Sequence, residues 1–97
     1  MIIQVSSLLR EGISRSVVEI KSQSDRIRPL VEKIEMFLSL GAEVGILIDL
    51  DTRTVVIYRN SGRPTRLTDN DTLTISELFP SWELPVRELW PLYLNEE

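Results

Sequence analysis

The sequence of 97 residues contains neither cysteine nor histidine. Without cysteine, the chain can form no disulfide and no zinc–thiolate centre. Without histidine, it lacks the most frequent general base and also the Ser-His and Cys-His nucleophile pairs. A metal site would therefore depend on oxygen ligands from Asp, Glu and the backbone, which favours Mg²⁺ or Mn²⁺ over zinc.

Long hydrophobic runs are also absent, since no apolar stretch approaches the roughly 18 residues that a membrane span needs. The opening "MIIQVSSLLREG" has no basic region before its apolar residues, so we predict neither a membrane span nor a signal peptide, and a cytoplasmic location. No feature indicates a small-molecule cofactor. With 42% hydrophobic residues, we expect a single domain over residues 1–97. A core of this size is marginal, and this predicts a homo-oligomer, a dimer or larger.

Negative charge predominates, with a net charge of −4, which argues against a nucleic-acid binder that uses its whole surface. Residues 53–66 nevertheless contain four arginines and no acid. One interpretation is a local strip that binds DNA phosphates, and the other is a solubilising rim on a hairpin. The candidate nucleic-acid-binding residues are Arg53, Arg59, Arg63 and Arg66.

The periodicity of apolar residues predicts a mixed α/β fold. Residues 16–21 read as a strand, and the polar stretch "SQSD" after them is rich in helix-capping residues. Apolar residues at spacings of three and four predict a helix from about Ile27 to Leu38, with Gly41 as its stop. Residues 44–50 and 54–59 predict a hairpin whose first strand is covered on both faces, and 65–68 predict a short further strand. The apolar tail, cut by Pro80, Pro85 and Pro91, is expected to wrap and pack rather than form one long helix.

The tripeptide Glu19-Ile20-Lys21 raises a question about catalysis. Residues two apart on a strand point to the same face, so Glu19 and Lys21 would lie side by side. A carboxylate can ligate Mg²⁺, and a nearby ammonium can orient water or stabilise charge on a phosphate. The plainer alternative is an exposed ion pair that contributes little to stability.

Several motifs recur in a recognisable order around this tripeptide. They are Glu19–Asp25, then a helix with Leu30, Lys33, Phe37 and Gly41, then Leu47-Ile48-Asp49 and Val55–Arg59, and finally "LFPSWELPVRELW". Over residues 14–91 this run resembles the C-terminal half of the Uma2 family (DUF820), whose members resemble PD-(D/E)XK restriction-endonuclease-like nucleases.

This resemblance implies a restriction-endonuclease-like mixed β-sheet with a flanking helix, truncated at the N-terminus. It also implies a Mg²⁺-dependent DNA endonuclease, whose site combines an upstream Asp with a Glu and a lysine. Glu19 matches the Glu, as catalytic residue and metal ligand. Lys21 matches the lysine of the general nuclease signature, and Lys33 matches the family's helix lysine, so both are catalytic candidates.

The upstream Asp of this pattern has no match in the chain. Where many members carry Pro-Asp, the sequence has Ser14-Arg15, and Glu11 is the sole acid before Glu19. A single carboxylate binds Mg²⁺ poorly, so the isolated monomer is expected to be inactive unless another chain supplies a ligand. The alternative function is therefore a catalytically incomplete oligomerisation or protein-interaction module.

The remaining polar and aromatic candidates each have a plain structural interpretation. Asp49 is a candidate ligand, but a turn acid at the start of "DLDTRT" is the simpler reading. Asp25 matches an acid of the family run, and otherwise reads as a cap or loop acid. Lys33 also fits a solvated helix position, paired with neighbouring acids. We expect three aromatic residues to belong to the core or an interface, namely Tyr58, Trp82 and Trp90.

Overall fold

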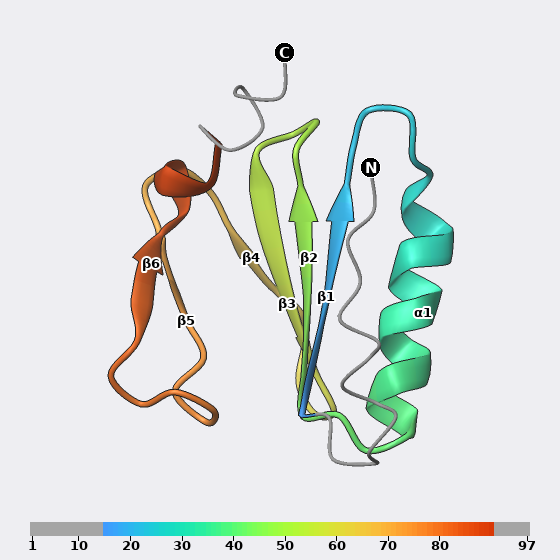
Figure 1. Ribbon diagram of the computed structural model, residues 1–97. Coiled ribbons are helices and arrows are strands. Elements are labelled where there is room, and N and C mark those ends of the chain that lie inside the picture. The colour runs from blue at the N-terminus through green and yellow to red at the C-terminus, as the bar shows by residue number, and fades with distance from the viewer. Residues whose placement is uncertain (1–14, 91–97) are drawn as a thin grey trace.

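The structure, a computed structural model, describes residues 15–90 (Figure 1). Its main sheet has the strand order β1-β2-β3-β4, with β1 parallel to β2 and the other neighbours antiparallel. The chain passes from β1 to β2 through the one α-helix. These elements are β1 (Ser16–Lys21), α1 (Ile27–Ser39), β2 (Val44–Asp49), β3 (Thr54–Arg59) and β4 (Thr65–Leu67). The predicted mixed α/β fold is thus confirmed, with its strand–helix–hairpin order.

Helix α1 lacks the predicted cap at its start but is followed by the predicted glycine at its end. The residue that precedes it is Arg26, which makes no side-chain capping hydrogen bond, so the polar stretch before the helix does not cap it. Pro29 lies in the first turn, where its missing N–H costs no hydrogen bond. After the helix, Gly41 adopts a φ of 118°, a conformation that side chains disfavour.

One face of the sheet packs against α1. Val17 of β1 and Leu47 of β2 meet Leu30 and Ile34 of the helix in one buried cluster. At Gly45 the helix comes so close that a Cβ would overlap the Cγ2 methyl of Ile34. The absence of a side chain at this position therefore sets how near α1 can approach the sheet.

The opposite face of the sheet packs against the tail. Three short elements form this layer: β5 (Thr72–Thr74), β6 (Glu83–Pro85) and the 3₁₀ helix η2 (Val86–Leu89). Leu73, Val86 and Trp90 join the second buried cluster, which includes Val44 and Ile57 of the sheet. The molecule consequently has three layers, with α1 and the β5–β6 pair on opposite sides of the sheet (Figure 1).

The tail confirms one expectation and corrects another. It does wrap and pack in short pieces, and β2 is covered on both faces as predicted. However, Phe79 and Trp82, expected to pack with the tail, are 55% and 41% exposed. They lie in the connection between β5 and β6, from which Ile75 belongs to the buried cluster and Leu78 packs against it.

The expected apolar segment 2–9 and Glu11 lie outside the described residues. Among residues 15–90, the helices are all too short or too polar to cross a bilayer.

Candidate functional site

Glu19 is the most unusual residue of the sheet. Burial alternates along β1, so that Val17, Glu19 and Lys21 point toward α1. The side chain of Glu19 is 0% exposed, beside Leu47 on the neighbouring strand. Among residues 15–90, neither carboxylate oxygen has a hydrogen-bond partner. The interpretation of Glu19 and Lys21 as an exposed ion pair is therefore wrong, because α1 covers the face on which they lie.

Two opposing influences act on the pKa of Glu19. Burial raises this pKa above its usual value, because removal from water penalises the charged form. The positive charge of Lys33 on α1 acts in the opposite direction and is the smaller of the two influences. Lys33 is half-buried. Its positive charge acts on Glu19, and both residues match the family pattern. The expected pairing of Lys33 with acids of its own helix does not occur among the described residues.

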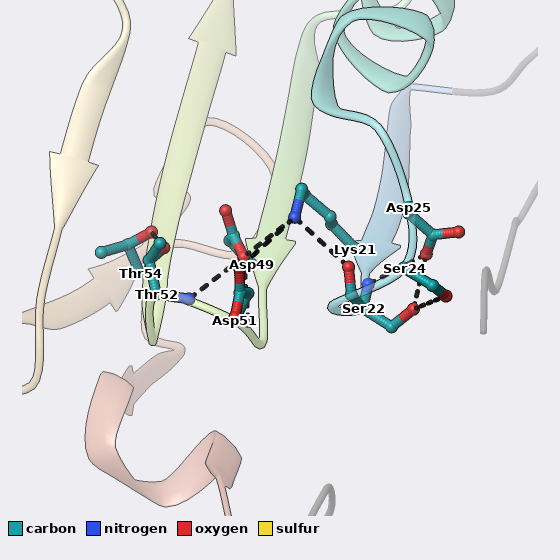
Figure 2. Close-up of polar contacts among 8 residues, drawn as sticks. All are labelled: Lys21, Ser22, Ser24, Asp25, Asp49, Asp51, Thr52 and Thr54. Carbon is teal, nitrogen blue, oxygen red and sulfur yellow. Dashed lines mark hydrogen bonds and ion pairs between the residues drawn. The ribbon is translucent and has the colours of Figure 1, made fainter.

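Lys21 makes its contacts at the ends of β1 and β2 (Figure 2). Its Nζ donates to the carbonyl oxygen of Ser22 at 3.2 Å. The same atom lies 3.9 Å from an oxygen of Asp49 and 4.0 Å from an oxygen of Asp51. Lys21 is only 9% exposed. Its ammonium group contacts two carboxylates, those of Asp49 and Asp51, and one carbonyl oxygen.

Asp49 combines a structural and an electrostatic contact. It is 6% exposed, and its Oδ1 accepts hydrogen bonds from the backbone N–H groups of Asp51 at 3.0 Å and Thr52 at 3.2 Å. These bonds define the turn between β2 and β3, as the interpretation of Asp49 as a turn acid predicted. The parallel register pairs Lys21 with Asp49, so the turn acid and the ammonium meet.

Asp25 accepts hydrogen bonds within the loop between β1 and α1. Its Oδ2 accepts hydrogen bonds from the backbone N–H and the hydroxyl group of Ser22, both at 2.9 Å. These hydrogen bonds lower the pKa of Asp25, since they favour the charged carboxylate. Asp25 thus acts as a loop acid rather than as a helix cap.

A divalent cation is the group that the family pattern implies, and Glu19 fits one part of such a site. A buried carboxylate with two unsatisfied oxygens has the chemistry of a Mg²⁺ ligand. Within residues 15–90, however, no three acidic side chains come close enough together to form a complete metal site. Glu19 is therefore a candidate ligand within an incomplete set, and a complete site would need water or further groups.

The four arginines proposed for DNA binding do not form one strip. Arg53 follows β2 with a φ of 57°, lies 3.5 Å from Asp69, and its guanidinium is 5.8 Å from the ring centre of Trp90. Arg59, at the other end of β3, pairs with Glu77. Two arginines remain exposed without an ion pair among the described residues, and these are Arg63 and Arg66.

The three aromatic residues predicted for the core or an interface differ in burial. Trp90 is buried and donates its indole N–H to Asp69 at 2.6 Å, whereas Tyr58 is half-buried against the helix-side cluster. Trp82 is exposed, so it does not belong to the core, and its place at an interface stays a prediction.

Sequence reasoning missed Asp51 and the contact of Lys21 with Asp49. The signal was present, since "DLD" directly follows a buried strand and Lys21 ends another strand. Because the carboxyl ends of parallel strands meet at the same edge of a sheet, these residues become neighbours once β1 and β2 are known to be parallel.

The model of the Uma2 family, described as "Putative restriction endonuclease", matches residues 14–87. No curated protein matches. A crystal structure from Anabaena variabilis ATCC 29413, described as "a putative nuclease belonging to DUF820", superimposes with a TM-score of 0.72 at 22% identity. The match covers 79% of this chain and 44% of that chain, and at this identity it shows a shared fold.

Proposed function

Because this chain belongs to the Uma2 family, we propose that it carries part of a Mg²⁺-dependent site of the PD-(D/E)XK type for hydrolysis of DNA phosphodiesters. The observation that carries the proposal is the buried carboxylate of Glu19, whose two oxygens have no hydrogen-bond partner within the described part of the chain. An isolated buried carboxylate is costly to a fold, and a bound divalent cation would remove that cost. Glu19 is accordingly proposed as the metal ligand.

The two lysines receive different roles in this proposal. Bound Mg²⁺ would supply Lewis-acid chemistry to a phosphate oxygen or a water molecule. Lys33 is favoured as the group that orients water or stabilises phosphate charge, because its charge already acts on Glu19. Lys21 remains the second candidate, although its ammonium is occupied by Asp49 and Asp51.

The upstream Asp of a PD-(D/E)XK site has no match in the sequence, and residues 15–90 hold no group of three or more acidic side chains that could bind a metal. We therefore propose that a monomer of this chain binds Mg²⁺ but does not cleave DNA efficiently. Cleavage would require a carboxylate from outside the described residues, in a homo-oligomer or from another chain. The chain spans 44% of the length of the DUF820 structure, so the activity of a complete relative does not transfer to it directly.

Calorimetric titration of Mg²⁺ and Mn²⁺ tests the metal ligand. Wild type should bind, and Glu19→Gln, which keeps the shape of the side chain but removes its charge, should not. Glu83→Gln is the matched control, because Glu83 also lies in a strand but is exposed. Equal binding by wild type and Glu19→Gln, or no binding by wild type, would exclude Glu19 as a metal ligand. Nicking of supercoiled plasmid by the same proteins then tests hydrolysis separately from binding.

DNA contacts are proposed for Arg63 and Arg66, which make no ion pair with the described residues. Replacing both by alanine should weaken DNA binding and reduce its salt dependence, because fewer phosphates are neutralised. Arg87→Ala is the control, since Arg87 is exposed in η2. An unchanged salt dependence in the double variant would contradict this assignment.

A second function is favoured by a different observation. Among the described strands, β1 and β4 are the edges of the main sheet. Helix α1 exposes Ile27 and Met36, each at 49%, and Leu40 directly after it is 71% exposed. Such edges and apolar side chains suit an oligomerisation or protein-interaction module. Sedimentation equilibrium of the calorimetry samples separates the two functions. A stable oligomer without metal binding supports the module, whereas metal binding by a monomer supports the half-site.

A further inference from the structure

Lys21 is placed where it could neutralise Glu19, yet the two do not pair. Their Cα atoms are separated by two residues of one strand, roughly 7 Å, and both side chains point toward α1. A lysine side chain can span such a distance. Instead, the Nζ of Lys21 contacts the carbonyl of Ser22, Asp49 and Asp51, and both oxygens of Glu19 stay without a hydrogen bond.

Of the two acids near Lys21, Asp49 is the one whose side chain is held in place by hydrogen bonds. Its carboxylate accepts two backbone hydrogen bonds from the β2–β3 turn, and its side chain as a whole is 9% exposed. Asp51 lies at nearly the same distance, but its side chain is 43% exposed, so water competes for it. Figure 2 shows Asp49 beside the ammonium of Lys21, at the turn.

We propose that Asp49 is a positioning residue that keeps Lys21 away from Glu19 and so leaves the buried carboxylate free for a divalent cation. The inference rests on the proposed role of Glu19 as the metal ligand. An ammonium on Glu19 would occupy its oxygens and repel a cation, and in a buried site this interaction is strong. Asp49 acts through Lys21 and does not itself touch the metal.

A double-mutant cycle on metal affinity tests this role. Asp49→Asn retains an oxygen that can accept the turn hydrogen bonds but loses the charge that attracts Lys21. It should weaken Mn²⁺ binding about tenfold or more, as loss of an outer contact of a metal site typically does. In a Lys21→Met background, Asp49→Asn should change the affinity little, because no ammonium remains to move. Asp51→Asn is the matched control and should bind as wild type does.

Two results of the cycle would overturn the proposal. If Asp49→Asn weakened binding equally with Lys21 and with Met at position 21, Asp49 would act as a ligand or through the turn alone. If Asp49→Asn left the affinity unchanged, Asp49 would have no positioning role.

A metal-free measurement keeps this inference separate from the proposed function. The carboxyl ¹³C resonance of Glu19 should titrate at lower pH in Asp49→Asn than in wild type, because Lys21 then approaches it. This shift should disappear in Asp49→Asn/Lys21→Met. Failure of wild type to bind metal would refute the proposed function, while the titration would still decide whether Asp49 restrains Lys21. An unchanged titration in Asp49→Asn would refute the inference.

Discussion

Replacement of Glu19 by leucine should make the protein more stable while removing its proposed metal ligand. A buried polar group without a hydrogen bond costs about 1–3 kcal/mol, and both oxygens of Glu19 are in this state. Exchange of buried charges for apolar residues of similar volume stabilises other proteins by about 1–4 kcal/mol. Leucine at this position would join the cluster of Val17 and Leu47. We therefore expect the free energy of unfolding to rise by about 1–3 kcal/mol near neutral pH.

The sign of the pH dependence follows from the raised pKa of Glu19. In the folded state the carboxyl is favoured in its neutral form, so its cost is smallest below its unfolded pKa. The cost appears as the pH rises through the higher folded pKa. The advantage of Glu19→Leu over wild type should accordingly be smallest at acidic pH and grow as the pH rises through the raised folded pKa of Glu19.

Urea unfolding without metal, at several pH values, measures this effect. Glu83→Leu is the control, since an exposed strand glutamate should change stability by no more than about 0.5 kcal/mol. The reasoning would be refuted if Glu19→Leu were less stable than wild type. It would also be refuted if the difference in free energy of unfolding between the two proteins did not change with pH. Added Mg²⁺ should stabilise wild type and leave the leucine variant unchanged.

Three further outcomes are expected. Gly45→Ala should cost about 1–3 kcal/mol in chemical unfolding, because the new methyl group meets the stiff β-branched Ile34, and an unchanged midpoint would contradict the close approach of the helix. Trp90→Phe should lower the thermal midpoint by several degrees, at about 4–8 °C per kcal/mol, since a buried indole hydrogen bond is lost; full stability would show that this bond contributes nothing. Lys33→Met should raise the pKa of Glu19 further, as followed by ¹³C titration, because the positive charge that lowers this pKa is removed. An unchanged titration curve would show that the charge of Lys33 does not act on Glu19.

The central elements of the fold could be predicted because their apolar periodicity is strong. Strand 16–21, the helix from Ile27 and the hairpin at 44–59 all depend on local patterns that the fold retains. The β5–β6 pair could not be predicted, because each strand has three residues and Pro85 interrupts the strand pattern. The exposure of Trp82, directly before β6, could not be predicted either, because tertiary packing decides which apolar side chains of this region are covered.

The candidate site could be predicted by residue type and not by environment. The alternation of Glu19 and Lys21 is the same whether water or a helix covers their face, and only the crossover through α1 decides between these cases. Likewise, the contact of Lys21 with Asp49 depends on the register of two parallel strands, which lie far apart in the sequence. The arginines were grouped by sequence proximity, whereas β3 separates Arg53 from Arg59 by its whole length.

The two buried clusters draw on different parts of the chain, and the tail layer could therefore open without the helix layer. The cluster beneath α1 is built from residues between Val17 and Tyr58, whereas the other requires Leu73, Val86 and Trp90 from the tail. Cooperative opening of the tail layer alone would expose Val44 and Ile57 to solvent but leave the helix seated over Glu19. Amide hydrogens of β5 and β6 should then exchange through a lower-energy fluctuation than those of β1. The environment of the carboxylate would persist through such fluctuations and change only when the helix layer itself opens.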